Sequence, residues 1–168
     1  MGEVFAANPD LDWVIGRCRV IDAEGREIRP LVTRYKNFLL DRLSLPLLLI
    51  ENPISQMAVF VRKDALHAVG PLRTDLHYTM DYDLWLRLYR RSPPRVLRET
   101  LASFRMYGGT KSMDGFARQF AEEHEVSREH ARASGLGWTV PLHWLSARKT
   151  VAAYRLMALT SASTGYRG

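Results

Sequence analysis

The sequence of 168 residues predicts a mixed α/β fold. Segments with strand-like alternation are interspersed with segments of helical periodicity, without the regular strand–helix–strand units of a doubly wound sheet. The composition, 46% hydrophobic and 25% charged, is that of a globular chain. This length is enough for one domain, or a large part of one, with a real core.

The expected strands are bounded by turn residues and are rich in β-branched or aromatic side chains. They are residues 12–21, 27–29, 55–61, 95–97 and 101–106. Residues 12–21 carry the clearest alternation, and Asp22 to Gly25 forms the turn that follows them. Residues 55–61 are expected to be a buried strand.

The expected helices carry apolar residues at helical spacing and end near Gly, Pro or Asn. They are residues 2–7, 33–42, 63–69, 81–91, 113–133 and 145–159. Thr33 is the expected cap of the second helix. The apolar segment between Pro46 and Pro53 fits neither pattern. We expect residues 1–137 to form the main body and residues 138–168 a basic amphipathic tail.

The charge distribution favours anionic partners. The net charge is +6, and residues 138–168 hold four Lys or Arg side chains and no Asp or Glu. Such a tail can lie on an anionic membrane surface, or it can pack on the domain with its charges in water. No recognisable nucleic-acid motif is present, so we expect no nucleic-acid partner.

Three observations predict a cytoplasmic location. Cys18 is the only cysteine, so no internal disulfide can form. The first residues lack the basic and apolar regions of a signal peptide. The longest apolar run, residues 45–50, is far shorter than the roughly 20 residues of a membrane span. The tail would then contact the inner face of the membrane.

Two acids open the helix expected at 81–91. Asp81 lies in its first turn, where a carboxylate complements the helix dipole and can accept free backbone N–H groups. Asp83 has Arg87 four residues later as its natural partner on the helix surface. These structural explanations compete with a catalytic role for Asp81.

A basic glycine-rich string begins at Phe104. Gly108 and Gly109 allow backbone N–H groups to approach an anion, and Lys111 adds a positive charge. The string lacks the spacing of a Walker A motif. A hairpin loop with solvated charges is the alternative.

Other groups have ordinary structural explanations. His124 and His130 are six residues apart, which does not match the zinc-binding i,i+4 spacing, so they are expected on a solvated helix face. Trp13 and Trp85 are expected in the core rather than as sugar-stacking platforms.

Taken together, these strings resemble the later half of the catalytic domain of inverting glycosyltransferases of family 2. The similarity lies in Asn52-Pro-Ile-Ser-Gln56-Met-Ala-Val-Phe60-Val-Arg62-Lys, Val69-Gly70-Pro-Leu, Tyr78-Thr-Met-Asp81-Tyr-Asp83-Leu-Trp85-Leu-Arg87 and Phe104-Arg105-Met-Tyr107-Gly-Gly-Thr-Lys111-Ser112. The resemblance implies a partial GT-A-like fold, a mixed sheet flanked by helices. The resemblance spans residues 8–125, and it implies that the nucleotide-binding half that precedes this region in the family is not part of these 168 residues.

The resemblance also implies site roles. Asp81 would be the general base, Arg105, Lys111 and Ser112 would lie near the diphosphate, and Asn52 and Gln56 would touch the acceptor. Many relatives carry Glu at the position of Met80 and His at that of Tyr107. Asp81-Tyr82-Asp83 does not match the family's metal motif, which lies at a strand end. The resemblance implies a divalent cation, Mg²⁺ or Mn²⁺, in the full-length family. We expect its ligands to be mostly absent from this chain and assign no metal ligand here.

The implied activity is transfer of a sugar from a nucleoside-diphosphate donor to a saccharide or lipid-linked hydroxyl, in polysaccharide or cell-envelope biosynthesis. Without the other half of the domain, we expect weak binding of nucleotide sugar and a tendency to self-associate through an unpaired sheet edge. The alternative is a non-catalytic interaction module that binds a partner chain or an anionic surface.

Overall fold

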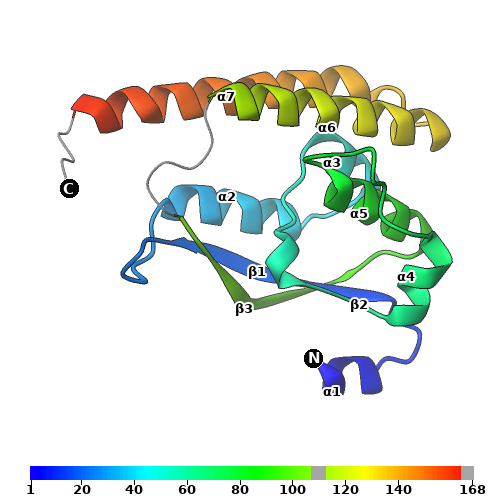
Figure 1. Cartoon of the computed structure of the whole chain (residues 1–168). Helices are drawn as coiled ribbons and strands as arrows, with labels where there is room; N and C mark the ends of the chain where they lie inside the picture. The colour runs from blue at the N-terminus through cyan, green and yellow to red at the C-terminus, as the bar shows by residue number, and fades with distance from the viewer. Residues whose placement is uncertain (107–112, 164–168) are drawn as a thin grey trace.

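The computed structural model describes the backbone of residues 1–106 and 113–163, and the side chains of residues 1–106 and 118–151. A small sheet forms one layer, and helices α2, α3, α5, α6 and α7 lie on one side of it (Figure 1). Helices α6 and α7 form the outermost layer. Within the described residues, no helix combines the length and apolar character that a membrane span requires.

The elements follow the chain in this order. The strands are β1 (Trp13–Ile21), β2 (Val59–Val61) and β3 (Arg95–Arg105). The helices are α1 (Gly2–Ala6), α2 (Pro30–Leu40), α3 (Leu45–Ile50), α4 (Lys63–Val69), α5 (Met80–Arg91), α6 (Met113–Ala133) and α7 (Thr139–Ser163), with a 3-10 turn, η1 (Gln56–Ala58).

The sheet is mixed, which confirms the predicted α/β class with flanking helices. Its order is β2-β1-β3, with β2 antiparallel and β3 parallel to β1. The β1–β3 register shifts on both sides of Arg17. Gly16 lies at the first shift, where an added Cβ would collide with the side chain of Leu101. The absence of a side chain therefore allows the two strands to approach at this point.

Several expected elements differ in detail. Residues 55–61 are not one buried strand, because η1 takes up three of them and β2 is a three-residue edge strand with Phe60 exposed. The strand expected at residues 27–29 does not form, and only an isolated antiparallel bridge joins Ile21 to Glu27. Helix α2 begins at Pro30 rather than Thr33, because proline suits a first helical turn and Arg29 turns the chain with a left-handed φ of 56°.

The core lies between β1 and α5. The rings of Trp13 and Trp85 stack with centroids 5.9 Å apart, and Tyr89 meets Trp13 edge-on. The indole of Trp13 also donates to the carbonyl oxygen of Ser92 at 2.9 Å. Both tryptophans are core residues, as predicted, and they fix α5 over the sheet.

Helix α5 is the best-buried helix of the described chain. Truncation of one of its buried side chains tests this core. Leu86 is fully buried within α5. We expect Leu86→Ala to lower the free energy of unfolding by about 2–5 kcal/mol, because it removes buried methyl groups and leaves a cavity. Denaturant unfolding measures this. Leu66→Ala, at an exposed position of α4, should change stability by less than about 1 kcal/mol; equal losses from the two variants would contradict this assignment of the core.

Candidate functional site

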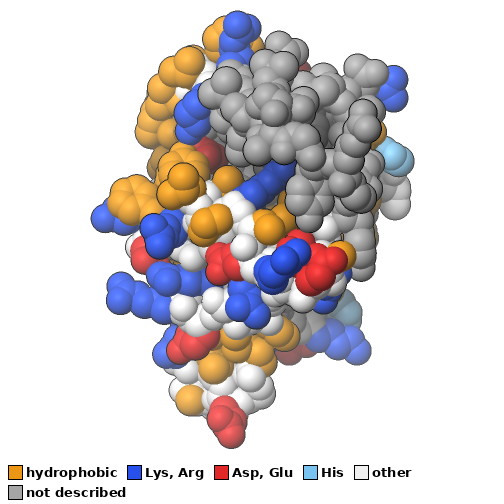
Figure 2. Space-filling view, turned by 90° about the vertical axis from the view of Figure 1, so that its left-hand side faces the viewer, with side chains coloured by type: hydrophobic (Ala, Val, Ile, Leu, Met, Phe, Trp, Pro, Cys, Tyr) orange, Lys and Arg blue, Asp and Glu red, His pale blue; other side chains and the backbone are white. Residues whose placement is uncertain are grey.

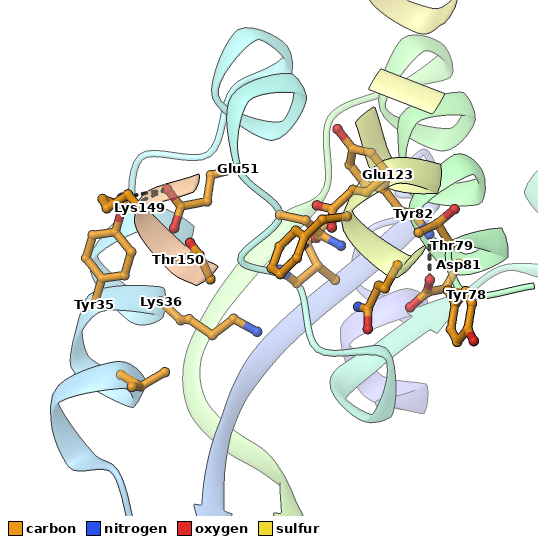
Figure 3. Close-up of a pocket in the computed structure, with 15 residues that line it drawn as sticks. Tyr35, Lys36, Glu51, Tyr78, Thr79, Asp81, Tyr82, Glu123, Lys149 and Thr150 are labelled. Atoms are coloured by element: carbon orange, nitrogen blue, oxygen red, sulfur yellow. Dashed lines mark hydrogen bonds and ion pairs between the residues drawn. The ribbon is translucent and has the colours of Figure 1, made fainter. Parts of the chain in front are cut away.

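A pocket of about 530 Å³ lies where α2, the segment after α3, the start of α5, α6 and α7 meet (Figure 3). Its walls combine aromatic rings, amides and charged groups. The lining residues are Val32, Tyr35, Lys36, Glu51, Asn52, Ile54, Tyr78, Thr79, Asp81, Tyr82, Gln119, Phe120, Glu123, Lys149 and Thr150. This size is typical of a site for a small molecule.

Asp81 lines this pocket from the first turn of α5, and its Oδ1 accepts a hydrogen bond from the backbone N–H of Tyr82 at 2.8 Å. Burial raises the pKa of Asp81 above its ordinary value, and the charge of Glu123 adds to this effect. Backbone N–H groups of the helix start act in the opposite direction but are outweighed. The result is a carboxylate that is a stronger base than an exposed aspartate.

Two charged residues of the pocket, Lys36 of α2 and Glu123 of α6, were not predicted as site residues from the sequence. Lys36 points into the pocket from α2, between the group formed by Tyr35, Glu51 and Lys149 and the group around Asp81 (Figure 3). Burial lowers the pKa of Lys36, partly offset by negative charges nearby that include Glu123. Neither residue had a sequence signal, because nothing in the helical pattern of α2 or the Glu-rich α6 distinguished one charged side chain from its neighbours.

A polar cluster holds α7 against the other side of the pocket. Glu51 accepts hydrogen bonds from Tyr35 at 2.9 Å and Ser146 at 2.6 Å, and it pairs with Lys149 at 3.2 Å. Burial acts to lower the pKa of Lys149, but its contacts with Tyr35 and Glu51 outweigh burial and raise it. Helices α2 and α7 are therefore tied together at the mouth of the pocket.

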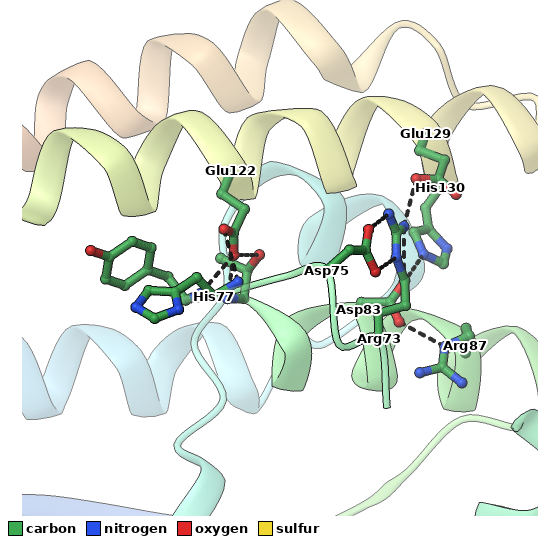
Figure 4. A network of polar contacts seen from close by, with 10 residues as sticks. Arg73, Asp75, His77, Asp83, Arg87, Glu122, Glu129 and His130 are labelled. Atoms are coloured by element: carbon green, nitrogen blue, oxygen red, sulfur yellow. Dashed lines mark hydrogen bonds and ion pairs between the residues drawn. The ribbon is translucent and has the colours of Figure 1, made fainter. Parts of the chain in front are cut away.

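Glu122 of α6 fixes the loop that leads into α5 (Figure 4). One carboxylate oxygen accepts hydrogen bonds from the backbone N–H groups of Tyr78 and Thr79, at 2.7 and 2.8 Å, and from the Thr79 hydroxyl. The other oxygen accepts from the N–H of His77 at 3.0 Å. Burial acts to raise the pKa of Glu122, but these hydrogen bonds outweigh it and lower the pKa. Asp81 follows this loop directly, so Glu122 helps to position it.

Asp83 has a different role from the one predicted. It does pair with Arg87, at 2.8 Å, but the pair is not on the surface, because Asp83 is fully buried. The second carboxylate oxygen lies 2.8 Å from Nε2 of His130 on α6 (Figure 4). His130 is buried as well, so its expected place on a solvated face was wrong. The sequence shows the i,i+4 spacing of Asp83 and Arg87 but not the helix that covers them.

The remaining predicted site residues are scattered. Asn52 lines the pocket, and its Oδ1 accepts a hydrogen bond from the N–H of Ile54 at 3.1 Å. Gln56 is exposed in η1, outside the pocket lining. Arg105 is exposed at the end of β3, also outside that lining, and donates to the carbonyl oxygen of Asp22 at 2.9 Å. Lys111 and Ser112 lie outside the described residues.

The described side chains do not assemble a metal site. Among them, no group of three or more His, Cys, Asp or Glu residues is arranged to hold a metal ion. The divalent cation implied by the resemblance therefore has no ligand set in this part of the chain.

Comparison with known proteins identifies no relative of the chain. No family model and no curated protein matches the chain. The resemblance to family 2 glycosyltransferases thus depends only on the residues quoted above.

The raised pKa of Asp81 predicts a pH-dependent stability. Above its ordinary pKa of 3.8, an unfolded Asp81 ionises more readily than the folded one, so ionisation favours unfolding as pH rises. We expect Asp81→Asn to raise the free energy of unfolding at neutral pH by about 1 kcal/mol. This gain in stability should disappear when the pH falls below the ordinary pKa of aspartate, because Asp81 is then protonated in both the folded and the unfolded state.

Denaturant unfolding at several pH values measures this difference. Asp75→Asn is the control, because hydrogen bonds from Arg73 lower the pKa of Asp75. Its substitution should therefore bring no gain at neutral pH. A less stable Asp81→Asn variant at neutral pH would contradict the predicted sign.

Loss of Glu122 should loosen the loop before α5. Glu122→Gln replaces one carboxylate oxygen by an NH₂ group, which cannot accept a hydrogen bond from a backbone N–H. We expect a loss of about 1–2 kcal/mol at neutral pH. Since the folded-state pKa of Glu122 is lowered, the loss should shrink as the pH falls below the ordinary value of 4.5.

A neighbouring acid on the same helix provides the control for this variant. Glu125 is exposed and pairs with Arg128, so Glu125→Gln should change stability by less than about 1 kcal/mol. Thermal or denaturant unfolding distinguishes the two. Equal effects of the two variants would show that Glu122 does not hold the loop.

Proposed function

We propose that the chain belongs to the machinery of an inverting glycosyl transfer, from a nucleoside-diphosphate sugar to a hydroxyl of a saccharide or lipid-linked acceptor. Polysaccharide or cell-envelope assembly is the corresponding process. The observation that carries the proposal is the position of Asp81, at the start of α5 inside a pocket of about 530 Å³. Asp81 also lies in one of the strings that carry the family resemblance.

Asp81 is proposed as the general base. Its carboxylate takes the proton of the acceptor hydroxyl while the acceptor oxygen bonds to the anomeric carbon. The bond from that carbon to the diphosphate oxygen breaks on the opposite face, and the nucleoside diphosphate leaves with the electron pair. A base whose pKa is raised toward working pH performs this step better, and such catalysis contributes about 10²–10⁴-fold. Burial raises the pKa of Asp81 in this direction.

The lining of the pocket supports a saccharide as the acceptor. Tyr78 and Phe120 offer ring surfaces, while Asn52 and Gln119 offer amide groups. A few polar groups that orient the ligand among aromatic walls are typical of small-molecule sites. Thr79 and Tyr82 complete the wall beside Asp81.

The proposed contacts to the donor diphosphate are Arg105, Lys111 and Ser112. Of these, Arg105 is held by the carbonyl oxygens of Asp22 and Ala23, so it reaches a diphosphate only after it releases them. Among the described residues, no group of three or more His, Cys, Asp or Glu side chains is arranged to hold a divalent cation. The ligands of a divalent cation would come from residues outside the described ones.

A non-catalytic interaction module is the second candidate. The observation that favours it is the row of exposed apolar side chains on α7, Leu142, Trp144 and Leu145. An apolar face of this kind is typical of a surface that binds a partner.

Transfer assays with the chain test the enzymatic proposal. A panel of nucleoside-diphosphate sugars is offered with saccharide and lipid-linked acceptors, and new glycosidic product is measured. Product formed by the wild-type chain would support the proposal, and Asp81→Asn should then lower the rate about 10²–10⁴-fold. Acceptor binding, measured by calorimetry, should stay unchanged in this variant.

Glu125→Gln is the matched control, since it removes an exposed acid of α6 that does not line the pocket. It should leave the rate unchanged. Full turnover by Asp81→Asn would refute the base assignment. Absence of both product and acceptor binding for the wild-type chain would refute the enzymatic proposal and favour the interaction module.

A further inference from the structure

Residues 139–151 of α7 bury polar side chains and expose large apolar side chains at several positions. Thr139 and His143 are buried, whereas Leu142, Trp144 and Leu145 are exposed, Leu145 by 60%. The buried polar groups have partners: the Thr139 hydroxyl donates to the carbonyl oxygen of Leu136 at 2.8 Å, and Nδ1 of His143 lies 3.2 Å from that of His124. Polar side chains therefore contribute to the packing of α7 against α6, while these three large apolar side chains turn outward.

Helix α2 presents a second exposed apolar face. Leu31, Tyr35 and Phe38 follow one another at helical spacing and are exposed, Leu31 by 74%. The two helices meet where Lys149 of α7 donates to the Tyr35 hydroxyl at 3.0 Å and also lies over its ring. Lys149 follows Leu142 and Leu145 on the same side of α7. The two apolar faces thus join in a single area.

This area, which we call the α2–α7 surface, is also basic. Its apolar members are Leu31, Tyr35, Phe38, Leu142, Trp144 and Leu145, and its basic members are Arg34, Arg42, Arg148 and Lys149. The guanidinium of Arg148 lies over the Trp144 ring at 4.5 Å and that of Arg42 over the Phe38 ring at 3.8 Å. Arg42, Arg148 and Lys149 therefore each lie directly beside an exposed aromatic ring.

Negative charge is scarce around the α2–α7 surface. Residues 30–40 and 138–168 contain no Asp or Glu. The acids that adjoin it are already paired, Glu51 with Lys149 and Asp41 with Arg17 at 3.0 Å. Figure 2 shows hydrophobic and basic side chains side by side on the upper left of the molecule. The surface therefore has an uncompensated positive charge.

We propose that the α2–α7 surface binds the face of an anionic phospholipid bilayer. Exposed Leu, Trp and Phe side chains enter the boundary between headgroups and acyl chains, where aromatic rings with a polar edge are favoured. The arginines stay at the level of the lipid phosphates. This mixture fits a lipid surface better than a neutral protein groove, because the apolar groups alternate with cations that need anions beside them.

The binding would place the pocket next to the membrane. Tyr35 and Lys149 belong to the α2–α7 surface and also line the pocket that contains Asp81. A substrate anchored in lipid could then reach Asp81 without leaving the bilayer. This consequence rests on the proposed function, whereas lipid binding itself does not.

Vesicle co-sedimentation tests the proposal. The chain is mixed with vesicles of pure phosphatidylcholine or of phosphatidylcholine with phosphatidylglycerol, and the bound fraction is measured. We expect binding to the anionic vesicles that weakens as salt is added. The double variant Trp144→Ser, Leu145→Ser should weaken it by about tenfold or more. Arg148→Gln should weaken binding to the anionic vesicles only.

Leu72→Ser is the matched control. Leu72 is 45% exposed and lies in the segment after α4, outside the residues of the α2–α7 surface, so this variant should bind like wild type. All substituted side chains are exposed, and circular dichroism checks that each variant folds. Equal losses from Leu72→Ser and the double variant would overturn the proposal, as would no vesicle binding by the wild type. A dimer that the double variant converts to monomers, without vesicle binding, would identify a second copy as the occupant and also overturn it.

Discussion

The buried carboxylate of Asp83 is the interaction on which the described structure depends most. A charge removed from water is strongly unfavourable unless close partners compensate it. Burial acts to raise the pKa of Asp83, but His130 and Arg87 outweigh it and lower the pKa. Arg87 also donates to the carbonyl oxygen of Val69 at 2.6 Å. One carboxylate therefore links α5 to α6 and, through Arg87, to the end of α4.

This link explains why the start of α5 is well defined. His130 holds Asp83 from one end of α6, and Glu122, two helical turns earlier, holds the loop before α5. Val126 lies between them on the same face of α6 and is buried. Asp81 is placed between these two attachments, and Glu123 of α6 faces the same pocket. Helix α6 thus acts as a rigid frame for the candidate base.

The sequence predicted most of the elements because their signals are local. The strand at residues 13–21, the stop at Gly70 and the helix of α5 all appear in the structure. The errors arose where local signals compete. Residues 55–61 are apolar enough for a strand, but they lie at the sheet edge, where only three residues pair. The pocket was predictable only in part, since Asp81 and Asn52 had local signals and Lys36 and Glu123 had none.

The sequence by itself determined the α/β class, the helix that carries Asp81 and Asp83, and the positive charge of the C-terminal region, because spacing and composition are properties of neighbouring residues. Only the tertiary structure decided which charges are buried, which of them face one pocket and which apolar groups stay in water. Asp83 changed from a surface partner to a buried link because α6, some forty residues later, covers it. Burial sets the strength of an ion pair and the pKa of a carboxylate, and burial comes from distant segments that no local pattern specifies.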